Sequence, residues 1–196
     1  MADPIDVLDF WLGRVGPDGW YTADDALDAE CRDLFGDVWM AALEGGLEHW
    51  VDGTVGTLAY VVICDQLARN MHRGHAKSFA TDAQARAAAR TALANGWDMN
   101  APEPERQFFY MPFMHSEDMA DQAFCVQLFA NRMPETGADQ ILHARAHETI
   151  IARFGRFPFR NEALGRESTS EERQFIVDGG YGSVFQNIKA SHASDA

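Results

Sequence analysis

Apolar residues recur every three to four positions along most of the chain, and no stretch shows the period-two alternation of a half-buried β-strand. Helix start and stop signals separate the periodic stretches: Asp3 with Pro4 and Thr22 or Asp24 at starts, and Asn95-Gly96 at an end. We therefore predict an all-α protein. The expected helices begin near Pro4, Asp24, Thr54, Asp82, Ser116, Ala138 and Ser168.

The spacing of these helices suits pairs packed antiparallel, as in an array of helical hairpins, although no repeated signature is visible. No linker or low-complexity segment divides the chain. Residues 1–189 are therefore expected to form a single all-helical domain, followed by a small, polar and frayed tail at 190–196.

The charge balance narrows the range of partners. Thirty acidic residues against sixteen basic ones give a formal net charge of -14, which argues against a nucleic-acid partner. The longest apolar run, Leu58–Cys64, is too short to span a bilayer, and the N-terminus lacks the features of a signal peptide. Cys31, Cys64 and Cys125 are widely spaced and are expected to be free thiols. We therefore predict a cytoplasmic protein that binds neither nucleic acid nor membrane.

Several expected helices carry ionisable or amide side chains on the same face as their apolar ones. A charge that is buried there without a partner would cost several kcal/mol, so these side chains should find partners. They could converge on one polar cavity, or they could pair within a helix, as Asp65 and Arg69 would four residues apart. The side chains concerned are Asp65, Arg69 and His72, then Asp118, Asp121 and Gln122, then His143 and His147.

The segment Ile150–Arg166 is rich in arginine, with Arg153, Arg156, Arg160 and Arg166 at the end of a helix and in the turn after it. A guanidinium presents a planar fork of donors that suits carboxylate or phosphate. This segment therefore predicts either an anion-binding site or a turn held by internal pairs with Asp and Glu.

No motif indicates a metal or an organic cofactor. His115, Asp118, Asp121 and His147 are ligand types that zinc or manganese accepts, but their spacing matches neither HExxH nor another tight signature. There is no P-loop, GxGxxG or GxSxG pattern. We predict no metal site and no cofactor.

Long motifs resemble those of a known family. Asp9-Phe10-Trp11, Ile63–Ala85, Phe108–Gln122 and His147–Arg166 are similar to segments of the bacterial domain of unknown function 924 family, over roughly Ile5 to Phe175. The resemblance implies an all-helical fold of the tetratricopeptide-like superhelical type, and no established activity. The motif residues that carry over are Asp65, Gln66, Arg69, Asn70, Arg73, Asp82, His115, Ser116, Glu117, Asp118, Gln122, His147, Arg153, Gly155, Arg156, Pro158, Arg160 and Asn161.

The chain departs from the family pattern at two places. Leu67-Ala68 stands where the family usually has Phe-Pro, so the helix is expected to run on smoothly there. Phe159 stands where the family tends to have His, so a mechanism that needs this histidine is not expected in this chain.

We interpret the chain as a protein with a polar pocket between helices that binds a small anionic ligand bearing phosphate or carboxylate. Catalysis there would be hydrolysis or group transfer, with His115 or His147 as acid or base oriented by Asp118 or Asp65. Two alternatives remain, a tetratricopeptide-like module that captures an acidic peptide and a purely structural ion-pair network. The expected ligand-binding residues are Arg69, Asn70, Arg73, Glu117, Gln122, Arg153, Arg156, Arg160 and Asn161.

Overall fold

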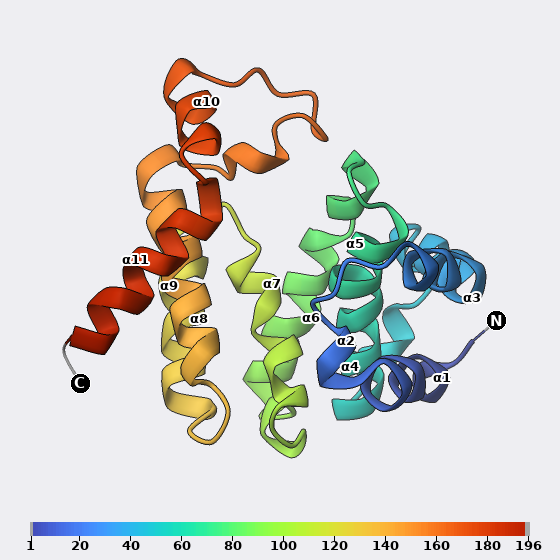
Figure 1. The fold of residues 1–196 in the computed structure, drawn as a ribbon. Helices are drawn as coiled ribbons and strands as arrows, with labels where there is room; N and C mark the ends of the chain where they lie inside the picture. Colours follow the sequence, from blue (N-terminus) through green and yellow to red (C-terminus); the bar gives the residue numbers. More distant parts are fainter. Residues whose placement is uncertain (1, 195–196) are drawn as a thin grey trace. The chain divides into compact units, whose positions relative to one another are not determined.

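The computed structural model describes residues 2–194, and every regular element in that range is a helix (Figure 1). The all-α prediction is confirmed. The chain divides into two compact units, Met1–Pro112 and Phe113–Ala196, each described below by itself. The tetratricopeptide-like arrangement and the single domain over residues 1–189 stay predictions.

The first unit is built mainly on α3, α4 and α6, with α4 packed against both α1 and α6, and α3 packed against the helices that continue α4. The elements are α1 (Pro4–Leu8), η1 (Asp9–Val15), α2 (Gly16–Gly19), α3 (Asp25–Leu43), η2 (Glu48–Trp50), α4 (Thr54–Val61), η3 (Val62–Leu67), α5 (Ala68–Met71), η4 (Ala76–Phe79), α6 (Asp82–Asn95), η5 (Asp98–Asn100) and η6 (Glu105–Phe109). The short helix α7 (Met111–Met114) follows and crosses the boundary in sequence.

Local signals place the helix ends of this unit as predicted. The Asp3 carboxylate accepts from the backbone of the first turn of α1, and Asp24 does the same for α3, so Asp24 rather than Thr22 is the cap. At the end of α6, Gly96 adopts φ +70°, the left-handed conformation that a side chain makes costly.

Two segments are π-helices rather than α-helices, η1 and η3. The helix does continue through Leu67-Ala68 without a break, but Val62–Leu67 is wound more widely than an α-helix. All six residues of η3 are buried, and η3 packs against α3, α4 and α6, so tertiary packing on several sides can hold this less favourable winding. The three-and-four spacing assumed for Asp65 therefore does not continue unchanged from Leu58.

The second unit contains an antiparallel pair of long helices, α8 (Met119–Arg132) and α9 (Ala138–Phe154), joined by a short connection (Figure 1). Helix α11 (Gly180–Ser194) packs against α9, and α10 (Ser170–Val177) contacts α11 and the short helix η7 (Pro158–Arg160). An apolar cluster of Ile150, Ile151, Phe157 and Phe175 is central, with Phe154, Tyr181 and Val184 packed against it.

Helix α11 continues through Ser194, so residues 190–194 of the predicted tail are helical, and 195–196 lie outside the described residues. Cys31, Cys64 and Cys125 form no disulfide among the described residues, as predicted, and all three are buried. Within residues 2–194, no helix combines the length and the apolar character needed to cross a membrane.

Candidate functional site

In the first unit, Arg69 binds two carboxylates. Its guanidinium lies 3.3 Å from Asp65 Oδ1 and 3.1 Å from Asp82 Oδ1. Asp65 is buried and also accepts from the Gln66 amide at 2.5 Å. Arg69 therefore joins η3 to the start of α6, and the within-helix pair expected from sequence is present together with a further acid.

Asn70 and Arg73 both bind Asp28 of α3. Arg73 donates to the two carboxylate oxygens of Asp28 at 2.7 and 2.8 Å, and the Asn70 amide donates at 2.9 Å. Burial raises the pKa of Asp28, but the hydrogen bonds from Arg73 and Asn70 outweigh it, and the pKa ends below its ordinary value. These two predicted ligand-binding residues therefore connect α5 and the turn after it to α3.

In the second unit, Glu117 holds the turn that follows α9. Its carboxylate accepts from Arg166 at 2.7 and 3.0 Å and from the backbone N–H of Phe157 at 2.8 Å. Burial raises the pKa of Glu117, and the Arg166 and Phe157 hydrogen bonds reverse the effect, so the net shift is downward. Glu117 thus ties the segment before α8 to the arginine-rich turn.

An ion pair between Arg156 and Glu172 also holds this turn. Arg156 donates to both carboxylate oxygens of Glu172 at 2.6 and 2.8 Å, and its Nη2 also donates to the carbonyl of Glu167 at 2.9 Å. The Asn161 amide donates to Ser168 Oγ at 3.0 Å and lies 3.4 Å from Glu172. The Arg156 hydrogen bonds are the main cause that lowers the pKa of Glu172 to about 2.

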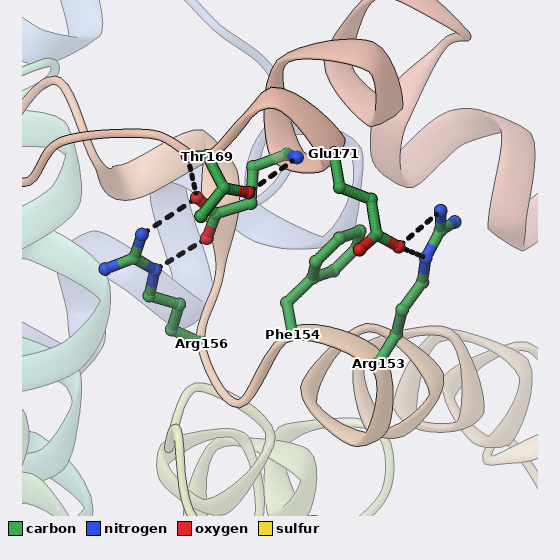
Figure 2. Close-up of a pocket in the computed structure, with 6 residues that line it drawn as sticks. Arg153, Phe154, Arg156, Thr169 and Glu171 are labelled. Carbon is green, nitrogen blue, oxygen red and sulfur yellow. Dashed lines mark hydrogen bonds and ion pairs between the residues drawn. The ribbon is translucent and has the colours of Figure 1, made fainter.

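A pocket of about 350 Å³ lies beside the Arg156–Glu172 ion pair (Figure 2). It is lined by Arg153, Phe154, Arg156, Thr169, Glu171 and Glu172.

The two arginines of the pocket are held differently. Arg153 lies over the Phe154 ring, 4.7 Å from its centroid, and pairs with Glu171 at 2.9 Å. The side chains of this pair are 53% and 63% exposed, whereas those of Arg156 and Glu172 are 28% and 3% exposed. Figure 2 shows Arg153 and Arg156 on opposite sides of Phe154, each paired with a different carboxylate. Arg156 is therefore fixed by a buried carboxylate, whereas Arg153 is held by an exposed ion pair and by its packing on Phe154.

His115 and His147 lie near each other, with ring centroids 6.3 Å apart. His147 Nδ1 lies 2.8 Å from the carbonyl of His143, so Nδ1 carries the hydrogen and donates. Burial lowers the pKa of His147 to about 3. A base this weak is poorly suited to proton transfer near neutral pH. The acid or base role of His147 stays a prediction.

The remaining predicted residues have structural partners as well. Asp118 caps α8, since its Oδ1 accepts from Ala120 N at 2.8 Å and Asp121 N at 3.2 Å. The N-cap is therefore Asp118 and not Ser116. The buried Gln122 donates from Nε2 to the carbonyls of Met114 and Ser116, and fixes the backbone around His115. The buried Arg160 lies over the Phe157 ring at 4.5 Å.

Within each unit, the structure sorts the predicted residues into small groups. His115 and His147 are neighbours, Arg153 and Arg156 line the pocket, and the others hold helices and turns together. Sequence reasoning missed Phe154, Thr169, Glu171 and Glu172 as pocket residues. The pattern Thr169-x-x-Glu172 is a capping-box signature, and the cap at Thr169 lies one residue after the predicted helix start at Ser168. No group of three or more His, Cys, Asp and Glu side chains in the described residues could hold a metal ion.

Comparison with known proteins identifies the family to which the chain is similar. The chain matches the family model described as "Bacterial protein of unknown function (DUF924)" over residues 7–180. It is similar to the solved structure of a protein of unknown function from Agrobacterium tumefaciens, with 41% sequence identity and a TM-score of 0.82. That similarity covers 88% of this chain and 96% of the other. No curated protein matches the chain.

Proposed function

The chain belongs to the DUF924 family of bacterial proteins, and we propose that it binds a small phosphate- or carboxylate-bearing molecule in the pocket at the start of α10. In this proposal, the guanidinium of Arg153 binds the anionic group of the ligand. The observation that carries this proposal is the contrast between Arg153 and the other arginines of the predicted site.

Arg73 and Arg156 each hold a carboxylate that is almost completely buried, that of Asp28 and that of Glu172. Drawing either arginine away would leave a buried charge without its partner, which is strongly destabilising. These arginines therefore support the structural alternative, in which they fix helix packing, and they are not available to an incoming ligand.

Arg153 is in the opposite situation. Its pair with Glu171 is exposed on both sides, and exposed ion pairs contribute about 0–1 kcal/mol. An anion can therefore take the place of Glu171 at little cost. The packing of the guanidinium on Phe154 keeps its donors in position while Glu171 turns away into solvent.

The other wall of the pocket also favours an anion. Thr169 is the N-cap of α10, and the first turn of a helix presents backbone N–H groups at the positive end of its dipole. The negative charge of Glu172 is offset by Arg156. The volume of about 350 Å³ lies in the range of small-molecule pockets, which supports a small ligand over the acidic peptide considered as the alternative.

Binding rather than catalysis fits the histidines of this unit. His147 has a pKa of about 3 because it is buried, so it cannot serve as an efficient proton carrier at neutral pH. The Asp118 carboxylate bonds to the backbone of α8 instead of orienting an imidazole.

The proposal is tested by a thermal-shift series with inorganic phosphate, sulfate and small carboxylates. A ligand that binds the native state raises Tm by mass action. The Arg153→Ala variant should lose this rise. The Arg145→Ala variant removes the same charge from an exposed position of the same helix, and it should keep the rise. If no anion raises the Tm of the wild type, or if Arg153→Ala responds as the wild type does, the proposal is wrong.

A further inference from the structure

The pocket at the start of α10 is lined by equal numbers of positive and negative side chains. Arg153 and Arg156 supply two guanidiniums, and Glu171 and Glu172 supply two carboxylates. Arg156 and Glu172 neutralise each other through two hydrogen bonds. The exposed pair of Arg153 and Glu171 remains for a ligand, which therefore meets one cation beside one anion.

A purely anionic ligand would use only half of this pair. Binding to Arg153 in place of Glu171 leaves the Glu171 carboxylate without its cation and close to the new negative charge. Like charges at short range repel each other, and the chain already carries a formal net charge of -14. The electrostatics of the pocket therefore favour a ligand that also brings a positive group for Glu171.

The contacts of this pair leave both side chains able to take a ligand group. Nε and Nη2 of Arg153 both donate to one oxygen of Glu171, Oε1, at 3.0 and 2.9 Å (Figure 2). The other oxygen, Oε2, accepts no hydrogen bond from a described residue. The guanidinium is kept in place by aromatic rings, 4.7 Å from the centroid of Phe154 and 5.8 Å from that of Phe175. Glu171 is largely exposed and can turn to follow a positive group.

The pocket also offers a surface for an apolar body. Phe154 contributes an aromatic ring to the lining, and this side chain is only partly buried. The volume of about 350 Å³ lies in the range of small-molecule pockets and exceeds what two small charged groups need. A hydrocarbon or aromatic group attached to the charged groups can therefore pack on Phe154.

We propose that the pocket binds a zwitterion with an apolar side chain, which is the chemistry of a free α-amino acid. The carboxylate of the ligand binds Arg153, its ammonium group binds Glu171, and its side chain packs on Phe154. An α-amino acid attaches both charged groups to one carbon atom, so they can reach an arginine and a glutamate that lie side by side. This inference rests on the anion-binding function proposed above and names its class of ligand.

Calorimetric titration with L-phenylalanine tests the proposal against two matched compounds. Hydrocinnamate keeps the ring and the carboxylate but lacks the ammonium group, and phenethylamine keeps the ring and the ammonium group but lacks the carboxylate. L-phenylalanine should bind up to about fivefold more tightly than either compound, which is the contribution of one exposed ion pair. If either compound binds as tightly as L-phenylalanine, the proposal is wrong.

The Glu171→Gln variant tests whether Glu171 is the partner of the ammonium group. Neutralising Glu171 removes that partner and also frees Arg153 for any carboxylate, so the preference for L-phenylalanine over hydrocinnamate should disappear. Glu162→Gln, which removes the same charge from an exposed position, should keep the preference. A preference that persists in Glu171→Gln would overturn the proposal.

Failure of this inference and failure of the anion-binding function give different results. Suppose that phosphate and hydrocinnamate bind the wild type and not Arg153→Ala, but L-phenylalanine binds no more tightly than hydrocinnamate. The pocket then binds anions, and the zwitterion proposal alone is wrong. If Arg153→Ala binds every compound as the wild type does, the anion-binding function is wrong, and the zwitterion proposal is wrong with it.

Discussion

Arg156 and Glu172 are joined by two hydrogen bonds, of 2.6 and 2.8 Å, that fasten the turn after α9 to the first turn of α10. Glu172 also accepts from Thr169 N at 2.7 Å, so one carboxylate both caps a helix and holds an arginine. The start of α10 forms one wall of the pocket, and its position depends on this pair.

Loss of Arg156 should therefore destabilise the second unit. In Arg156→Ala the buried Glu172 carboxylate keeps its backbone partner but loses its cation, and an unpaired buried charge is costly. We expect a drop in Tm of several degrees in thermal unfolding. Arg153→Ala, which breaks an exposed ion pair and a surface contact with Phe154, should change Tm by far less. Equal effects of the two variants would contradict the distinction between them.

Asp118 should act as a helix cap and not as a catalytic acid. Asn caps helices about as well as Asp does, whereas Ala costs about 1 kcal/mol at this position. Asp118→Asn should therefore unfold in urea with nearly the wild-type free energy, and Asp118→Ala should lose about 1 kcal/mol. An equally large loss in both variants would show that the carboxylate charge matters beyond the cap.

Acid should destabilise the protein through His147. The ordinary pKa of histidine is about 6.5, and that of His147 in the folded protein is about 3, so the unfolded chain binds the proton more readily. The stability from the neutral ring is complete above pH 6.5 and is lost as the pH falls toward 3, by up to about 1.4 kcal/mol for each pH unit.

Urea unfolding at several pH values measures this slope. His147→Phe removes the titrating group and should make stability fall less steeply below pH 6.5, while the exposed His49→Phe should keep the wild-type slope. Some slope should persist, because burial also lowers the pKa of His72 and His143. An unchanged slope in His147→Phe would mean that His147 is not held neutral by the fold.

Helix bounds were predictable where a local signal determines them. The helix over Ala138–Phe154 and the end of α6 at Gly96 follow from apolar periodicity and from a glycine in the left-handed conformation. The π-helix Val62–Leu67 was not predictable, because its winding depends on burial against helices distant in sequence.

The candidate site was predictable in residue type and less so in arrangement. The arginine-rich turn was identified from its composition, and His147 from its position on an apolar helix face. Which arginine pairs with which acid could not be predicted, because Arg156 and Glu172 come from different elements, and so do Arg166 and Glu117. The low basicity of His147 could not be predicted either, since it comes from burial and from neighbours such as Phe157 and Tyr181 that only folding brings together.

The exchange of Glu171 for an anion on Arg153 is tested most directly by calorimetric titration of Glu171→Gln with inorganic phosphate. Glu171 competes with the ligand for Arg153, so its neutralisation should tighten phosphate binding by up to about fivefold, the equivalent of an exposed ion pair of about 1 kcal/mol. Glu162→Gln, which removes the same charge from an exposed position of the same unit, should bind as the wild type does. Unchanged or weaker binding by Glu171→Gln would contradict the account.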